Sequence, residues 1–276
     1  MSRIAARFAA LKHEGRGALI PFLEAYDPDA ATSMAILRGM PSAGADLIEI
    51  GMPFTDPMAD GPTIQAAGLR GLKAGATLVR TLAMVQDFRL DDADTPVILM
   101  GYLNPIASYG PQRFCERATA AGVDGVIVVD LPTEEAHLLA GHAHTNRLDI
   151  IRLVAPTTDD ARLPLVLQGS SGFVYYVSIT GITGTRSASA ADLALAIPRV
   201  RAVTDLPIAI GFGVRTPAQA AEAVRVADAA VVASALIETL SASLDTEGRA
   251  APDTAQRVLD QVRALADGVR SARVPA

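Results

Sequence analysis

Cysteine, long apolar runs and an excess of basic charge are all lacking in this sequence. Cys115 is the single cysteine among 276 residues, so no internal disulfide can form and no cysteine-rich metal site exists. We therefore expect a reducing, cytoplasmic compartment. No apolar run approaches the roughly 20 residues that span a bilayer. The net charge of −6 argues against nucleic acid or an anionic membrane as a partner.

The N-terminal segment is amphipathic and carries arginines, a pattern also found in transit peptides. However, Ile4, Phe8 and Leu11 recur at helical spacing, and an apolar strand pattern follows at once. The spacing therefore predicts a packed first helix.

Short β-rich apolar runs recur along the whole chain. They lie at residues 18–23, 46–51, 96–101, 125–130, 149–154, 173–178, 207–212 and 229–234. The intervals can hold helices at residues 30–43, 63–88, 111–121, 134–145, 159–167, 190–203 and 217–226, with another at 254–266. Continuous apolar strands indicate a parallel sheet that is buried on both faces. The pattern predicts an α/β fold, a (β/α)8 TIM barrel, as one domain over residues 1–276 with an extra N-terminal helix.

A doubly wound sheet is the main alternative. It would carry a glycine-rich fingerprint after its first strand. The segment IPFLEAYDPD, which follows that strand here, contains no glycine.

Glu49 is a carboxylate inside an apolar strand, in the segment DLIEIG. Alternation puts Leu47 and Glu49 on one face and the bulky Ile48 and Ile50 on the other. Glu49 then points into the barrel, where a lone carboxylate is costly unless it is paired or functional. Arg152, the one basic residue within a predicted strand, is the candidate for an ion pair. We favour a functional role.

Two aspartates follow on the next loop. Asp56 precedes Pro57, a position typical of turns. Asp60 is close enough in sequence to Glu49 to return to the mouth of the barrel. Two carboxyl groups over one pocket can move protons in both directions.

Small-residue turns follow the late strands. They are SITGITGTRSAS (178–189), GFGVRTP (211–217) and VASALIE (232–238), with Ser234 at a helix start. TIM barrels often bind phosphate with the loops after strands 7 and 8 and a helix N-terminus. The first of these loops is long enough to act as a lid, guarded by Arg186. We expect no metal site, because His137, His142 and His144 do not share one helix face.

The segment DLIEIGMPFTDPMADGPTIQ closely resembles the signature of the tryptophan synthase α subunit family. The segments ALIPFLEAYDPD, LMGYLNP, DLPTEEA, LVAPTT, GFVYYVSITGITG and GFGVRTPAQA are similar to family segments in family order. The resemblance covers nearly the whole chain. It implies a TIM barrel that cleaves indole-3-glycerol phosphate to indole and glyceraldehyde 3-phosphate by a retro-aldol reaction.

The resemblance also implies roles for individual residues. Glu49 matches the acid/base that protonates indole C3, and Asp60 matches the carboxylate that interacts with the indole N–H. The implied substrate-binding residues are Phe22, Tyr102, Tyr175, Thr183, Gly184, Gly213, Ala233 and Ser234. The implied partner is the β subunit, contacted through the Pro53–Asp56 loop. Pyridoxal phosphate belongs to that subunit, and this chain is expected to need no cofactor.

Two residues depart from the family pattern. Ala233 stands where the family usually has glycine in the phosphate site, and Tyr26 replaces another glycine. A left-handed backbone at Ala233 would strain the site.

Three alternatives remain open on the sequence. The chain could be a catalytically poor allosteric partner, although retention of Glu49 and Asp60 argues against this. It could be a stand-alone indole lyase. It could also be another phosphate-binding barrel such as an isomerase.

Overall fold

The computed structural model describes residues 2–177, 190–211 and 213–272. In these ranges, nine parallel strand segments form one sheet in the order β5-β4-β3-β2-β1-β9-β8-β7-β6. The strands are β1 Ala18–Glu24, β2 Ile48–Gly51, β3 Val97–Gly101, β4 Gly125–Val128, β5 Asp149–Ile150, β6 Arg152–Val154, β7 Val174–Val177, β8 Ile208–Gly211 and β9 Ala229–Val232.

The predicted fifth strand closes the barrel by pairing with a strand on each side. Its first half, β5, pairs with β4, and its second half, β6, pairs with β7. Only Ile151 separates the halves, and its N–H donates to the carbonyl of Val126 at 3.0 Å. The two ends of the sheet are therefore consecutive in the chain, and the nine segments make the nearly closed eight-stranded barrel that the sequence predicts.

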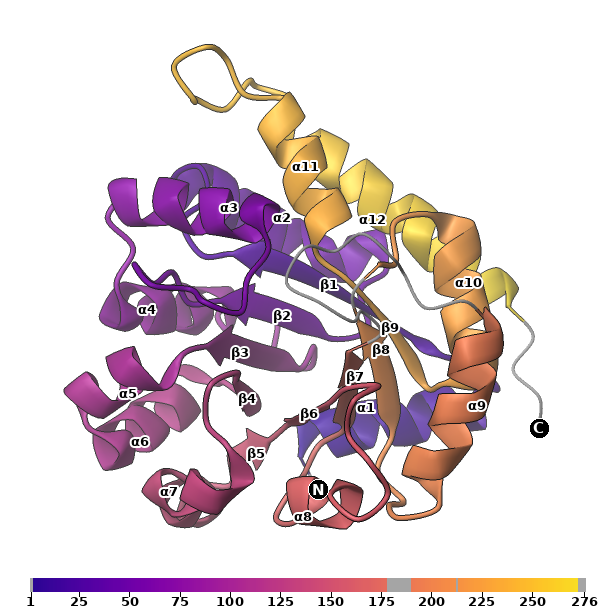
Figure 1. Ribbon diagram of the computed structural model, residues 1–276. Coiled ribbons are helices and arrows are strands. Elements are labelled where there is room, and N and C mark those ends of the chain that lie inside the picture. The colour runs from indigo at the N-terminus through magenta and orange to yellow at the C-terminus, as the bar shows by residue number, and fades with distance from the viewer. Residues whose placement is uncertain (1, 178–189, 212, 273–276) are drawn as a thin grey trace.

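The helices lie around the outside of the strands (Figure 1). They are α1 Arg3–His13, α2 Ala30–Ala43, α3 Pro62–Lys73, α4 Leu78–Phe88, α5 Leu103–Tyr109, α6 Pro111–Ala121, the 3-10 helix Thr133–Leu138, α7 Ala140–Thr145, α8 Leu163–Leu167, α9 Ala190–Arg201, α10 Pro217–Val226, α11 Ser234–Ala242 and α12 Thr254–Ser271. Among the described residues, none of these helices is long and apolar enough to cross a membrane.

The helices differ from the sequence expectation in several places. The interval 63–88 holds two helices, because Gly75 adopts a φ of +91° and Thr77 caps a new helix through its side chain. The interval 134–145 holds a 3-10 turn and a short helix, and only Leu163–Leu167 of the interval 159–167 is helical. Helix α5 was not predicted, and the last helix continues to Ser271.

Helix α1 closes the end of the barrel at which the strands begin. Its residues Ile4, Phe8 and Leu11 are buried against the barrel interior, as their spacing predicts. Phe8 meets Phe173 with ring centroids 5.9 Å apart. Burying large apolar side chains contributes about 1.5–3 kcal/mol each. In the described residues, apolar side chains therefore fill this end of the barrel, and the cavity described below opens at the opposite end.

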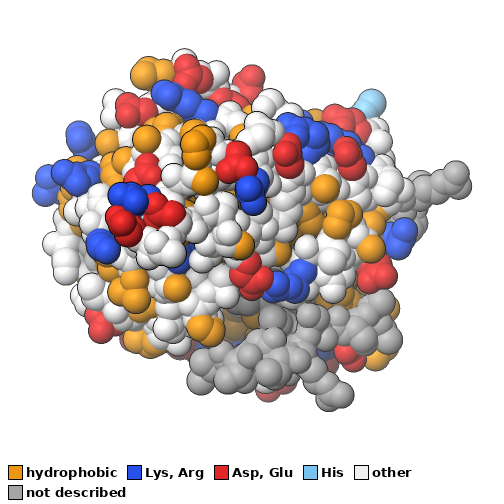
Figure 2. Space-filling view, turned by 90° about the horizontal axis from the view of Figure 1, so that it is seen from above, with side chains coloured by type: hydrophobic (Ala, Val, Ile, Leu, Met, Phe, Trp, Pro, Cys, Tyr) orange, Lys and Arg blue, Asp and Glu red, His pale blue; other side chains and the backbone are white. Residues whose placement is uncertain are grey.

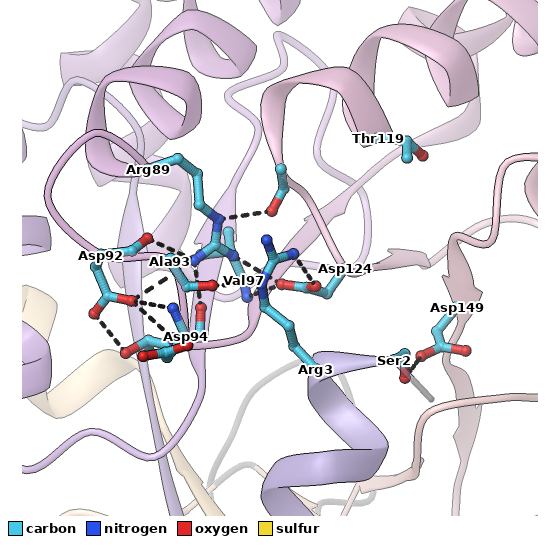
Figure 3. Close-up of polar contacts among 12 residues, drawn as sticks. Ser2, Arg3, Arg89, Asp92, Ala93, Asp94, Val97, Thr119, Asp124 and Asp149 are labelled. Carbon is cyan, nitrogen blue, oxygen red and sulfur yellow. Dashed lines mark hydrogen bonds and ion pairs between the residues drawn. The ribbon is translucent and has the colours of Figure 1, made fainter.

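Buried aspartates at the start of the strands tie α1 to the barrel (Figure 3). Asp124, just before β4, accepts the Val97 N–H at 2.8 Å, and Arg89 binds the same oxygen at 2.8 Å. Arg3 of α1 donates a hydrogen bond to the other carboxylate oxygen of Asp124 at 2.9 Å. Asp46, before β2, is held in the same way. It accepts the N–H of Leu19 at 2.9 Å and pairs with Arg7 of α1.

The surface gives no sign of a polyanion-binding face in the direction of Figure 2. Basic and acidic side chains are interspersed on that face. Such a mixed distribution agrees with the net charge of −6.

We predict that Asp124→Ala lowers the free energy of unfolding by about 3 kcal/mol, because it leaves a largely buried guanidinium and a backbone N–H without their acceptor. The matched control is Asp91→Ala, which removes a solvent-exposed ion pair with Arg38. We expect the control to cost less than about 1 kcal/mol. Urea unfolding measures both values, and equal losses in the two variants would contradict the structural role of Asp124.

Candidate functional site

A cavity of about 470 Å³ opens where the strands end. Its floor is apolar and includes Phe22, Met100, Val129, Leu153 and Val231. Its ionisable side chains are Glu24, Glu49, Asp60, Tyr102, Tyr175, Arg215 and Glu238. A largely apolar cavity with a few convergent polar groups is the usual form of a small-molecule site.

Glu49 points from β2 into this cavity. Ile48 and Ile50 pack in the layer between strands and helices, whereas Leu47 lies in the barrel interior, as alternation predicts. The Glu49 side chain is 1% exposed, and its Oε2 atom has no hydrogen-bond partner among the described residues. Burial raises the pKa of Glu49 to about 8, and the nearby Asp60 adds to the shift. Glu49 is therefore mainly a neutral acid at pH 7.

The candidate ion-pair partner of Glu49 lies elsewhere. Arg152 is absent from the cavity lining, and its guanidinium donates to the backbone carbonyl of Leu131 at 3.0 Å. Glu49 consequently keeps its raised pKa, because no cation in the described ranges offsets the cost of burial.

Asp60 lies above Glu49 on the loop between β2 and α3. Burial raises the pKa of Asp60 to about 6, against the opposing effect of a hydrogen bond from the Tyr102 hydroxyl. That hydroxyl also accepts the N–H of Ala59 at 3.0 Å, which fixes the loop over the cavity. Phe54 packs on Tyr102 with ring centroids 5.5 Å apart. Asp60 is therefore mainly ionised at pH 7, and the two carboxyl groups differ in charge.

Glu24 is a third carboxyl group in the cavity, and the sequence analysis did not identify it. Its side chain is 5% exposed at the end of β1, on the same face as Phe22. Gly51 of β2 makes room for it, because a Cβ there would collide with the Glu24 carboxyl and lie 2.6 Å from the Phe22 ring. Burial raises the pKa of Glu24 well above its usual range, followed by the charges of Asp60 and Asp27. Alternation from Phe22 could have indicated this position.

Tyr175 reaches the cavity from β7. Its side chain is buried, and burial followed by the nearby Glu49 raises the pKa of its phenol well above the usual range. The phenol stays protonated at any physiological pH. Gly211 of β8 leaves space for the Tyr175 ring, since a Cβ at Gly211 would overlap with that ring.

The loops after β8 and β9 form another part of the cavity wall. Gly213 adopts a φ of +90°, which favours glycine, and lines the cavity beside Ala233 and Ser234. Ser234 begins α11. Ala233 has a φ of −117°, outside the left-handed region, so the strain considered for this position is absent. Thr183, Gly184 and Arg186 lie outside the described residues.

The second departure from the family pattern has a backbone consequence. Tyr26 adopts a φ of +67°, in the left-handed region where glycine is favoured. It lies outside the cavity lining. The next residue, Asp27, is buried and paired with Arg70 of α3 at 2.6 and 2.9 Å. Tyr26 therefore affects a turn behind the site rather than the lining of the site.

Other residues considered from the sequence are not part of the cavity. Asp56 is exposed on the β2–α3 loop and does not line it. In the described ranges, no three His, Cys, Asp or Glu side chains are grouped so as to hold a metal ion. Cys115 is buried in α6, away from the site.

Comparisons with known proteins agree over the full length of the chain. A family model described as tryptophan synthase alpha chain matches residues 8–270. The tryptophan synthase alpha chain of Granulibacter bethesdensis is 72% identical over 276 residues, covering 100% of this chain and 99% of the relative.

Solved structures agree with this result. The crystal structure of tryptophan synthase subunit alpha from Legionella pneumophila str. Paris has a TM-score of 0.89 at 34% identity, covering 98% of this chain and 99% of that chain. A chain of tryptophan synthase from M. tuberculosis in an aminoacrylate-bound form has a TM-score of 0.84 at 36% identity, covering 98% and 100%. On the sequence match, the barrel and the cavity together, the chain belongs to the tryptophan synthase alpha chain family.

Proposed function

We propose that this chain cleaves indole-3-glycerol phosphate into indole and glyceraldehyde 3-phosphate, as the alpha subunit of tryptophan synthase in L-tryptophan biosynthesis. One observation carries the proposal. A neutral carboxylic acid, Glu49, and an ionised carboxylate, Asp60, face one apolar cavity in a member of this family. The reaction is a carbon–carbon bond cleavage that needs a proton donor and a stabilised cation, and these two groups supply both.

Glu49 begins the reaction by donating its proton to C3 of the indole ring. Protonation converts the ring into an indolenine cation, which accepts the electron pair of the breaking bond between C3 and the glycerol carbon. The hydroxyl on that carbon becomes the aldehyde as it loses its proton. The Glu49 carboxylate takes up this proton and returns to its acid form, so the cycle balances.

Asp60 acts on the ring nitrogen. A carboxylate that accepts the indole N–H stabilises the positive charge that develops when C3 is protonated. The hydrogen bond from Tyr102 and the partial exposure of Asp60 favour its ionised form relative to Glu49. The difference in environment assigns the acid role to one carboxyl and the electrostatic role to the other. Phe22 and Tyr175 would enclose the ring.

Substrate phosphate would bind where the loops after β8 and β9 line the cavity. The start of α11 presents backbone N–H groups that have no acceptor within the helix, and the helix dipole favours an anion there. Gly213, Ala233 and Ser234 line this region. Thr183 and Gly184 remain predicted contacts from the family resemblance.

The β subunit of tryptophan synthase is the proposed partner, through the Pro53–Asp56 loop. Thr55 and Asp56 are exposed there, and Met58, just beyond, is 71% exposed. An exposed apolar side chain beside the cavity mouth suits a surface that a partner covers. We propose that pyridoxal phosphate belongs to that subunit and that the alpha chain needs no cofactor.

An indole-release assay tests the proposed function. Glu49→Gln should keep the fold and lower turnover by ~10²–10⁴-fold, because the proton donor is lost. Asp60→Asn should also be severe, because the charge that stabilises the indolenine cation is lost. The control Glu116→Gln changes an exposed glutamate on α6 and should keep normal turnover. Near-normal indole release from folded Glu49→Gln would remove Glu49 from the mechanism, and running the assay with and without a β subunit distinguishes a stand-alone lyase.

The activity should also depend on pH in a bell-shaped manner. Asp60 must be ionised, so kcat/KM should rise as the pH increases through about 6. Glu49 must be protonated, so kcat/KM should fall as the pH increases through about 8. Steady-state assays between pH 5 and 9 measure both limbs. A profile that is still rising at pH 9 would exclude Glu49 as the proton donor.

Ala233→Gly should change the affinity for glycerol phosphate by less than about twofold, because Ala233 already has a negative φ and keeps its N–H group. Calorimetric titration of the two proteins measures the change. Tenfold tighter binding by the glycine variant would mean that the alanine strains the site after all.

A further inference from the structure

We infer that Arg215 is a substrate-binding residue that exchanges its carboxylate partner, Glu238, for the phosphate group of the substrate. The inference deepens the proposed function and rests on it. Arg215 is the one lysine or arginine among the described residues that line the cavity. The acidic side chains of that described lining are Glu24, Glu49, Asp60 and Glu238.

The position of Arg215 fits this role. It follows Gly213 by two residues on the loop after β8, and both residues line the cavity. Its guanidinium makes a two-pronged interaction with Glu238 of α11, in which Nη1 lies 3.2 Å from Oε1 and Nη2 contacts Oε2. Glu238 is one helical turn beyond Ser234, a rise of roughly 6 Å. A change of side-chain rotamer can carry the guanidinium over that distance to the start of α11.

The present ion pair is easily exchanged. The side chains of Arg215 and Glu238 are 50% and 42% exposed, and exposed pairs of this kind contribute little to stability. A phosphate dianion carries more charge than a carboxylate and matches the guanidinium fork equally well. Glu238 is exposed enough to turn toward solvent once its partner has left.

Charge balance explains why the site needs this cation. Glu24 and Glu49 are buried, and burial raises the pKa of both carboxyl groups, that of Glu49 to about 8, so that Glu49 is mainly neutral at pH 7. Asp60 remains negative, and Glu238 adds a second negative charge beside the start of α11. An incoming dianion would meet net negative charge if backbone N–H groups alone received it. Arg215 offsets part of that repulsion.

Titration calorimetry with glycerol 3-phosphate tests the exchange through two variants with opposite expected effects. Arg215→Gln should weaken binding by about tenfold, because a charge-assisted contact is lost. Glu238→Gln should tighten binding about threefold or more, because the competitor for Arg215 loses its charge. Arg215→Lys should lie between the wild-type protein and Arg215→Gln, because it keeps the charge without the fork.

Two controls make the outcomes distinct. Arg162→Gln breaks another exposed arginine–glutamate pair, with Glu134, away from the cavity and should leave the affinity unchanged. Indole-3-propanol, which has no phosphate, should bind all variants equally. Unchanged affinity in Arg215→Gln, or equal weakening in both Arg215→Gln and Glu238→Gln, would overturn the exchange. If the wild-type protein bound indole-3-propanol but not glycerol 3-phosphate, the proposed phosphate subsite itself would be wrong.

Discussion

The burial of the Glu49 carboxyl group inside the barrel is the constraint on which the site depends. The side chain is 1% exposed and has no cation beside it in the described structure. Ionising a carboxyl group in such a place is costly, so burial favours the protonated form that the proposed mechanism requires. The strand register places apolar residues on both sides of Glu49, because Glu49 pairs with Phe22 of β1 and with Ile98 of β3. The apolar residues beside it keep water out and hold its pKa near 8.

Buried carboxyl groups at the two ends of the barrel have different environments. At the end where strands begin, Asp46 and Asp124 accept strand N–H groups and bind arginines of α1. There each buried carboxylate accepts hydrogen bonds from a strand N–H group and from arginine side chains. At the end where strands finish, Glu24 and Glu49 are buried, and among the described residues no cation offsets the rise in their pKa values. The same residue types therefore stabilise the fold at one end and, in the proposed mechanism, supply a proton at the other.

The mouth of the barrel also shows why small residues matter to the site. Because Gly51 has no side chain, the Glu24 carboxyl can lie beside it. Gly211 leaves room for the ring of Tyr175 in the same way. In both cases a larger neighbour on the adjacent strand occupies the place of the missing side chain. The proposed substrate needs a cavity that is apolar around the indole ring, acidic at the reacting carbon and cationic at the phosphate. The distribution of Glu49, Asp60 and Arg215 around one cavity fits these three needs.

Local pattern in the sequence was sufficient for much of this protein. Eight apolar runs predicted the barrel, the spacing of Ile4, Phe8 and Leu11 predicted the first helix, and alternation through Leu47 predicted that Glu49 faces inward. These features depend on residues only a few positions apart, whose periodicity is fixed by helix and strand geometry. The family resemblance rested on equally local motifs, and the comparisons bear it out.

Tertiary structure decided the features that depend on distant residues. The division of the fifth strand at Ile151 follows from barrel closure, because the two halves pair with strands from opposite ends of the sheet. The pairing of Arg215 with Glu238 joins residues 23 positions apart, one on the loop after β8 and the other on α11. The raised pKa values of Glu24, Glu49 and Asp60 depend on burial, which only the assembled barrel creates. The sequence alone identified Glu49 and Asp60, but the exclusion of water raised their pKa values, and the pairing of distant strands brought Glu24 into the same cavity.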